Sequence, residues 1–186
     1  SAGIASFRYI AEPWSHWLAV TDPGVDPADY EQAVGYLRTR AEAGDARSQA
    51  TLSSAFHDAD GRLVYESTVA PWCSGAGGCA VFTVNPDPDI EDPQVPVNKG
   101  RFEWSEADRA TYGQMGLDGE YIDSYLGRAT VVDLRRSHMA AADTPLTFRT
   151  SDRRVGTPQV FATTEFARWV TDDVHDALGR WTMANG

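Results

Sequence analysis

The stretch GLDGEYIDS, residues 116–124, decides the fold that the sequence predicts. Its two glycines frame a tight link, and residues 120–124 have the aromatic and branched content of a short strand. Because side chains alternate along a strand, Tyr121 and Asp123 are expected on one face, opposite Glu120. The stretch therefore predicts a strand that ends in a carboxylate.

Helix signals lie on both sides of this stretch. Ser105 and Asp108 have the spacing of a capping box, and Gly116 ends the helix that they begin. Two more helices are expected over about residues 26–44 and 157–179, each with a proline near its start and a glycine at its end. Apolar residues recur at helical spacing in both segments, so each helix has one face for a core.

Short apolar strands alternate with these helices, over residues 6–14, 80–84, 120–124 and 180–185. Strands that alternate with helices form parallel βαβ units. We therefore expect an α/β protein with a parallel (β/α) barrel of the TIM type, in a single domain over residues 1–186. A complete barrel takes about 250 residues. The chain would then be a partial barrel, or a fragment of a larger catalytic domain whose remainder is its partner.

Two stretches depart from this alternation. Residues 51–57 and 62–67 flank the turn sequence Asp-Ala-Asp-Gly, so residues 51–80 are expected to form a hairpin or loop excursion. Residues 126–156 are expected to form a long loop, which contains Arg136 and His138. Long loops beside a barrel rim are where substrate contacts are usually built.

Composition narrows the classes of partner. The net charge of −11 argues against nucleic acid, because phosphate binding needs clustered Lys and Arg. No apolar run approaches the roughly 20 residues that cross a bilayer. Six Trp residues are generous for 186 residues, and flat aromatic faces suit the apolar faces of sugar rings. A neutral ligand such as a carbohydrate fits this composition.

The two cysteines leave two interpretations open. Cys73 and Cys79 enclose a flexible Ser-Gly-Ala-Gly-Gly loop, which would let them form a disulfide. A disulfide would favour an oxidising compartment and a secreted or extracytoplasmic protein. Two free thiols in a loop are the alternative.

Polar residues follow several of the expected strands. Glu12, Asn85, Asp87, Asp123 and Asn185 all lie at or just past a strand end. The carboxyl ends of parallel strands form one rim, where barrel enzymes place their chemistry. We therefore expect these side chains to share a site.

Residues 116–124 also resemble a glycoside-hydrolase barrel, in which a helix ends at a glycine-rich link and the next strand carries a carboxylate. The nearest likeness is to retaining α-glycosidases of the α-galactosidase and α-N-acetylgalactosaminidase type, which have a nucleophilic Asp after a middle strand. The resemblance covers roughly residue 82 to the end. It implies cleavage of glycosidic bonds in an oligo- or polysaccharide, without a cofactor or metal.

Under this interpretation Asp123 is the nucleophile. Glycoside hydrolysis needs two carboxyl groups about the bond, and Glu12 is the candidate for the second, as acid/base. Glu12 as an acceptor for a sugar hydroxyl, or as an exposed Glu before a proline, are the alternatives. Sugar would contact a set of aromatic and polar residues along the rim. These are Trp14, Trp17, Trp72, Asn85, Asp87, Tyr121, Arg136, His138 and Asn185.

Two other functions remain open. A non-catalytic carbohydrate-binding or structural module would bind sugar without turnover. A metal-dependent hydrolase would use Asp87, Asp89 and Asp123 together, although the calcium-loop pattern is absent.

Overall fold

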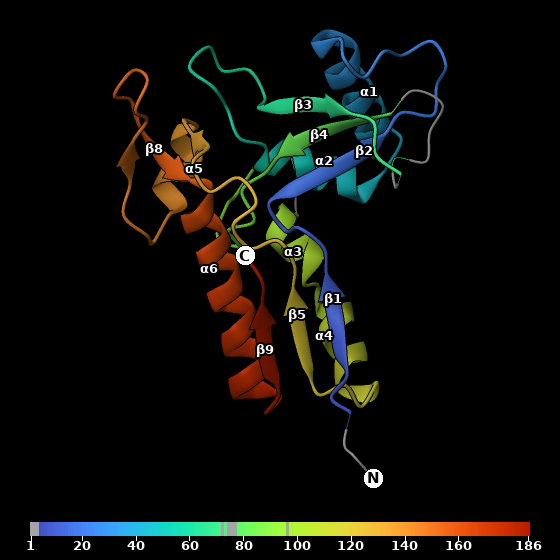
Figure 1. Ribbon diagram of the computed structural model, residues 1–186, viewed down its shortest axis with the longest axis vertical. Coiled ribbons are helices and arrows are strands. Elements are labelled where there is room, and N and C mark those ends of the chain that lie inside the picture. The colour runs from blue at the N-terminus through green and yellow to red at the C-terminus, as the bar shows by residue number, and fades with distance from the viewer. Residues whose placement is uncertain (1–3, 72, 74–77, 96) are drawn as a thin grey trace.

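The computed structural model describes residues 4–71, 73, 78–95 and 97–186. Three small sheets, each of three strands, make up its β-structure (Figure 1). Helices pack against them, and the antiparallel sheet of β2, β4 and β3 lies above the parallel sheet of β1, β5 and β9 in this view.

The parallel sheet places the strand ends that carry the candidate chemistry. It consists of β1 (Phe7–Ile10), β5 (Gly119–Ile122) and β9 (Trp181–Ala184), in the order β1-β5-β9. Ile10 and Ile122 of one face pack against α4 (Glu106–Gln114), α6 (Gln159–Thr171) and the π-helical segment η1 (Asp172–Ala177). All three strands point toward the antiparallel sheet (Figure 1), so their carboxyl ends meet at the middle of the molecule.

The opposite face of the parallel sheet is uncovered by any element that the structure describes. Tyr9 is 55% exposed, Trp181 71% and Met183 47%. Gly119 allows the Phe7 ring to lie against the sheet, since a Cβ at this position would come within 2.4 Å of that ring. This face is therefore aromatic and open to solvent.

The second sheet is antiparallel, with β4 (Cys79–Thr83) between β2 (Ser15–Ala19) and β3 (Tyr65–Thr68). Its inner face packs on α1 (Tyr30–Glu42), through Leu18 and Phe82 of the sheet and Leu37 of the helix. Helix α2 (Ala46–Ser54) comes after α1 in the chain, and α3 (Lys99–Glu103), which comes after β4, packs on α2. The third sheet is also antiparallel, in the order β6 (Val132–Asp133), β8 (Val155–Pro158), β7 (Thr147–Phe148), and α5 (Arg136–Ala141) packs on it.

The predicted TIM-type barrel is wrong. The described strands form one parallel and two antiparallel sheets, with no closed or partial barrel. The strand expected over residues 6–14 ends at Ile10, and after a turn at Pro13 and Trp14 the chain enters the antiparallel sheet as β2. The buried strand expected over 80–84 then pairs antiparallel with β2, because a continuous apolar run does not encode the direction of its neighbour.

The region 51–80 also differs from the expected hairpin. Residues 51–54 end α2, whose N-cap Asp45 accepts a hydrogen bond from the backbone of Ser48. Only one bridge, between His57 and Leu63, joins the two sides of the Asp58–Gly61 turn, and β3 pairs with β4 instead. The long loop expected over 126–156 contains β6, α5 and β7.

Several local signals are confirmed. Ser105 and Asp108 form a complete capping box at the start of α4. Gly116 and Gly179 have positive φ angles of 65° and 63°, the left-handed conformation typical of a glycine after a helix. The terminal strand is β9. Among the described residues, no helix is long and apolar enough to cross a membrane, as the sequence predicted.

Candidate functional site

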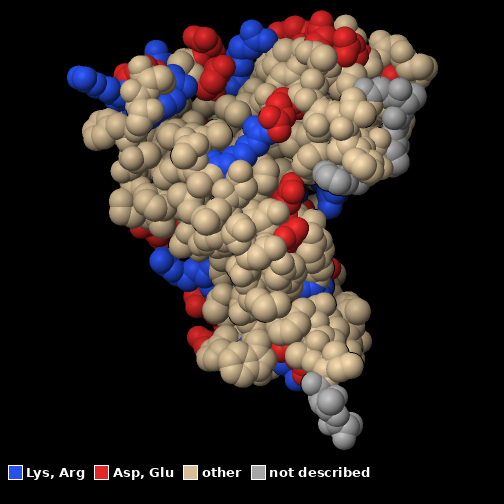
Figure 2. Space-filling view, viewed as in Figure 1, with Lys and Arg blue, Asp and Glu red and all other residues tan. Residues whose placement is uncertain are grey.

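A pocket of about 510 Å³ opens at the carboxyl ends of β1 and β5. Its lining is Tyr9, Ala11, Glu12, Ser15, Trp17, Arg47, Lys99 and Asp123. These residues come from the parallel sheet, the antiparallel sheet and the helices α2 and α3. The space-filling view shows acidic and basic side chains close together in the middle of the molecule, while much of the lower half carries neither charge (Figure 2). We call this cavity the β1–β5 pocket.

The backbone around this pocket is held in an uncommon conformation. Glu12 has a φ of 42° and Ser124 a φ of 52°, both in the left-handed region that non-glycine residues rarely adopt. The indole of Trp14 donates to the Ser124 carbonyl at 2.7 Å, which ties the turn after β1 to the turn after β5. Strained backbone persists where surrounding contacts impose it, and such positions cluster at functional sites.

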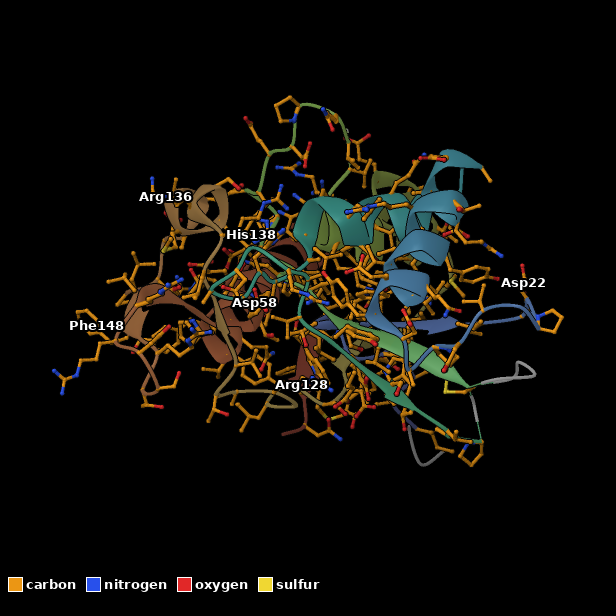
Figure 3. All side chains as sticks on the ribbon, turned by 90° about the horizontal axis from the view of Figure 1, so that it is seen from above. Asp22, Asp58, Arg128, Arg136, His138 and Phe148 are labelled. Atoms are coloured by element: carbon orange, nitrogen blue, oxygen red, sulfur yellow. A yellow bond between two sulfur atoms is a disulfide. The ribbon has the colours of Figure 1, made fainter. Side chains whose placement is uncertain are left out.

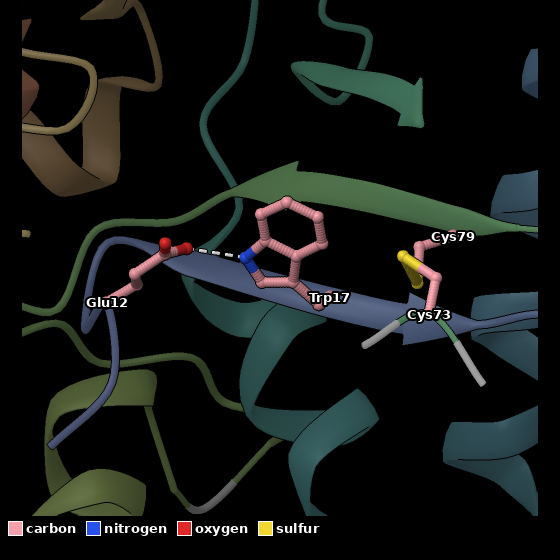
Figure 4. Close-up of a disulfide and its surroundings, with 4 residues drawn as sticks. All are labelled: Glu12, Trp17, Cys73 and Cys79. Carbon is pink, nitrogen blue, oxygen red and sulfur yellow. Dashed lines mark hydrogen bonds between the residues drawn. A yellow bond between two sulfur atoms is a disulfide. The ribbon is translucent and has the colours of Figure 1, made fainter. Parts of the chain in front are cut away.

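The Glu12 carboxylate is ordered by two donors from β2. Its Oε2 accepts from the Ser15 hydroxyl at 2.9 Å and from the indole N–H of Trp17 (Figure 4). Trp17 also packs beside Cys73 and Cys79, which form a disulfide with a Cα–Cα distance of 5.5 Å. The disulfide interpretation of the two cysteines is therefore confirmed. The Trp17 side chain is held by its hydrogen bond to Glu12 and by its packing against the disulfide.

The Asp123 carboxylate is ordered from the parallel sheet itself. Its Oδ2 accepts from the Tyr9 hydroxyl of the neighbouring strand, and the Tyr9 ring stacks on Tyr121 at 5.7 Å between centroids. Donation by Tyr9, with help from Asn185 and the Ser124 backbone, lowers the pKa of Asp123. The same hydrogen bond raises the pKa of Tyr9 to about 12. Asp123 is therefore ionised and Tyr9 protonated at neutral pH.

Asn185 supports the same turn from the end of β9. Its side-chain Oδ1 accepts from the Ser124 backbone N–H at 2.6 Å, and its backbone carbonyl accepts from the N–H of Tyr125 at 2.7 Å. The carboxyl ends of β5 and β9 thus meet beside Asp123, whereas Asn85 and Asp87, which were expected on the same rim, do not line this pocket.

Two cations complete the pocket lining. Lys99, at the start of α3, is 1% exposed and its ammonium pairs with Glu103 one turn later. Burial lowers the pKa of Lys99, and the Glu103 charge opposes this shift. Arg47 of α2 lies 3.8 Å from the same Glu103 carboxylate. The lining therefore carries carboxylates from the sheets and cations from the helices.

The remaining predicted site residues lie elsewhere. Asn85 is fully buried, and its Oδ1 accepts from the backbone N–H of Asp87. Arg136 is exposed on α5 and points away from the protein (Figure 3). Trp14 is 6% exposed, and its indole holds the turn after β5 instead of lining the pocket. Trp72 lies outside the described residues.

His138 is part of a buried polar cluster of its own. Its Nδ1 faces the Asp133 carboxylate, and its Nε2 lies 3.0 Å from the Ser53 carbonyl. Both partners are hydrogen-bond acceptors, so the ring links the Asp133 carboxylate to the backbone of α2. Asp133 also accepts from the backbone N–H groups of His57 and Arg135. The cluster ties α2, β6 and α5 together, and none of its members lines the β1–β5 pocket.

The sequence interpretation missed five pocket residues, namely Tyr9, Ala11, Ser15, Arg47 and Lys99. Tyr9 carried a usable signal, since it pairs in register with Tyr121 and alternation along β1 puts it on the same face as Asp123. Lys99 carried none. It reaches the pocket only because α3 packs on α2.

Comparisons with known proteins do not indicate a function, so the proposal below is argued from the geometry of the site. No family model, no curated protein and no solved structure gives a significant match to the chain. Among the described residues, no group of three or more His, Cys, Asp or Glu side chains could hold a metal ion. Asp87 and Asp89 line a different cavity from Asp123, so the three carboxylates of a metal-dependent hydrolase do not meet.

Proposed function

We propose that the β1–β5 pocket binds a carbohydrate and that Asp123 is the nucleophile that cleaves a glycosidic bond there. The observation that carries this proposal is the pairing of carboxylates with aromatic rings in one pocket. Asp123 with Tyr9, and Glu12 with Trp17, each combine an acceptor for sugar hydroxyls with a flat ring. Such rings suit the apolar faces of sugars.

The open face of the parallel sheet extends this aromatic surface. Tyr9 belongs both to the pocket lining and to the exposed face that also carries Trp181. A sugar chain bound in the pocket would therefore find further rings beside it. Lys99 and Arg47 add N–H donors to the same lining, and the Ser15 oxygen, whose hydrogen goes to Glu12, adds an acceptor.

The proposed reaction assigns the two carboxylates different tasks. The ionised Asp123 attacks the anomeric carbon, and the bond to the leaving-group oxygen breaks as Glu12 transfers a proton to that oxygen. Water then hydrolyses the glycosyl–Asp123 ester, with Glu12 accepting its proton. The lowered pKa of Asp123 supports the nucleophile role, since the attacking carboxylate must be ionised.

A panel of aryl glycosides and oligosaccharides, assayed for released product, tests this proposal. Asp123→Asn is expected to lower kcat by about 10³-fold or more while the affinity for the sugar changes little. Asp60→Asn, the same change at an exposed turn, should keep full activity. Activity that survives Asp123→Asn would refute the assignment.

Binding without turnover is the second candidate, and one observation favours it. The Glu12 carboxylate already holds Trp17 and Ser15, so its task could be to orient the indole rather than to transfer protons. This version predicts that sugars bind without product and that Trp17→Ala abolishes binding. Calorimetry with the same sugars separates the two candidates. The disulfide supports an oxidising compartment for either one.

A further inference from the structure

The antiparallel sheet joins the disulfide to the β1–β5 pocket. Trp17 of β2 lies opposite Val81 of β4 in the register, and Cys79 comes two residues before Val81. Because side chains alternate along a strand, Trp17, Val81 and Cys79 share one face, opposite the face that packs on α1. Trp17 packs there against Val81 and the two cysteines. Side chains in contact therefore lead from the disulfide to Trp17, which lines the pocket.

On the pocket side, Trp17 orients the Glu12 carboxylate. The indole N–H donates to Glu12 Oε2 (Figure 4), and the Ser15 hydroxyl donates to the same oxygen at 2.9 Å. The Glu12 backbone has a φ of 42°, a conformation that persists only where surrounding contacts impose it. A shift of the Trp17 indole would therefore remove one of the two contacts that hold this carboxylate.

The disulfide ties the loop after β3 to this face of the sheet. Among the described residues, the backbone of Cys73 makes one hydrogen bond, from its N–H to the Ala70 carbonyl at 2.9 Å within the same loop. Cys73 is 7% exposed and Cys79 is 1% exposed, so the pair belongs to the packing against Trp17. Without the covalent bond the loop gains conformational freedom, and Trp17 loses part of its support.

We infer that the Cys73–Cys79 disulfide positions Glu12 through Trp17, so that reduction by a dithiol disrupts the β1–β5 pocket. In the reduction, a thiolate of the dithiol attacks one sulfur to form a mixed disulfide, which the second thiol of the reagent then resolves. The protein gains two electrons and two protons as two thiols, and the reagent leaves as a cyclic disulfide. The effect on turnover rests on the proposed function of Glu12, whereas the effect on side-chain positions does not.

NMR of the whole protein tests the positioning step without a substrate. The chain has six Trp and two Cys, so the Trp17 indole N–H is assigned by its absence from Trp17→Phe, and dithiothreitol acts on one disulfide. We expect reduction to shift this indole resonance and the Glu12 carboxyl carbon resonance, while far-UV circular dichroism stays unchanged. Cys73→Ala/Cys79→Ala should show the same shifts without reductant. Val69→Ala, an exposed position in the same loop, should show neither shift.

A double-mutant cycle on a glycoside that the protein cleaves tests the effect on turnover. Removal of the disulfide should lower kcat by about tenfold or more, and should change KM less, because a displaced Glu12 transfers protons poorly. Trp17→Phe keeps a ring against the cysteines but has no N–H for Glu12. In this variant, removal of the disulfide should lower kcat no further.

The outcomes separate this inference from the proposed function. The inference is overturned if the Trp17 and Glu12 resonances stay in place on reduction, or if the reduced protein unfolds. Additive effects of Trp17→Phe and of disulfide removal on kcat would overturn it as well. If both resonances shift and no glycoside is cleaved in either redox state, the proposed function fails and the positioning by the disulfide stands.

Discussion

Two pairs of carboxylates in this protein differ in what surrounds them. Asp123 and Glu12 of the β1–β5 pocket are partly exposed, and each accepts a hydrogen bond from an aromatic donor. Asp87, in the loop after β4, and Glu165 of α6 are buried, and their carboxyl groups hydrogen-bond each other. The pKa of Asp123 is lowered, and that of Asp87 is raised.

The difference shows that donors, as well as burial, set the charge of a carboxylate. A hydrogen bond to the ionised form stabilises that form, whereas burial without a donor stabilises the protonated form. The β1–β5 pocket is therefore suited to a nucleophile or a hydroxyl acceptor, whereas the Asp87–Glu165 pair is suited to holding a proton. Each variant below removes either a buried carboxyl group or a hydrogen-bond donor to an ionised one.

The largest effect is expected for Asp87→Asn on the pH dependence of stability. The pKa of Asp87 is raised from 3.8 to about 8, so its stabilising contribution is present below the unfolded pKa and is lost as pH rises toward 8. Over that range the group lowers the free energy of unfolding by up to about 1.4 kcal/mol per pH unit. Urea unfolding at several pH values should show a shallower slope in Asp87→Asn. An unchanged slope would mean that the pair holds no proton.

A smaller effect of the same sign is expected at Glu120 of β5, whose side chain lies on the helix-covered face of the parallel sheet. Glu120 is fully buried and its two oxygens accept no hydrogen bond from the described residues. Burial raises its pKa to about 7, and Arg8, 3.7 Å away, opposes the shift. Glu120→Gln should remove a slope of up to about 1.4 kcal/mol per pH unit between pH 4.5 and 7. Glu91→Gln, at an exposed position, is the control and should keep the wild-type slope.

Local features of the fold and of the Asp123 site could be predicted from the sequence. The capping box at Ser105, the glycine at 116 and the alternation along residues 120–122 all depend on neighbours in the chain, and all are observed. Asp123 was found as a carboxylate at the end of an apolar strand. Such signals act over a few residues, so a single sequence is enough to read them.

Features that depend on distant contacts could not be predicted. The parallel interpretation of residues 80–84 failed because both faces of β4 are buried, which fits parallel and antiparallel neighbours alike. Glu165 was missed because it lies in an apolar helix, and it meets Asp87 only when α6 packs beside the loop after β4. Asp87 itself was expected on the rim with Asp123, which required a barrel that the chain does not form.

The smallest effect is expected for Tyr9→Phe, which removes the aromatic donor from Asp123 but leaves the ring. The pKa of Asp123 should rise toward its usual value, as NMR titration of the carboxyl carbon would show, because the Tyr9 hydrogen bond is the main cause that lowers it. Because the lowered pKa stabilises the folded state only above the unfolded pKa, the loss of stability should vanish in acid and stay small at neutral pH, where water screens this exposed pair. Tyr65→Phe, which loses a hydrogen bond to the Ala28 carbonyl, should leave Asp123 unchanged. If Asp123 keeps its low pKa in Tyr9→Phe, then the hydrogen bonds from Asn185 and the Ser124 backbone are enough to stabilise the ionised form. The two carboxylate pairs would then differ by burial more than by their donors.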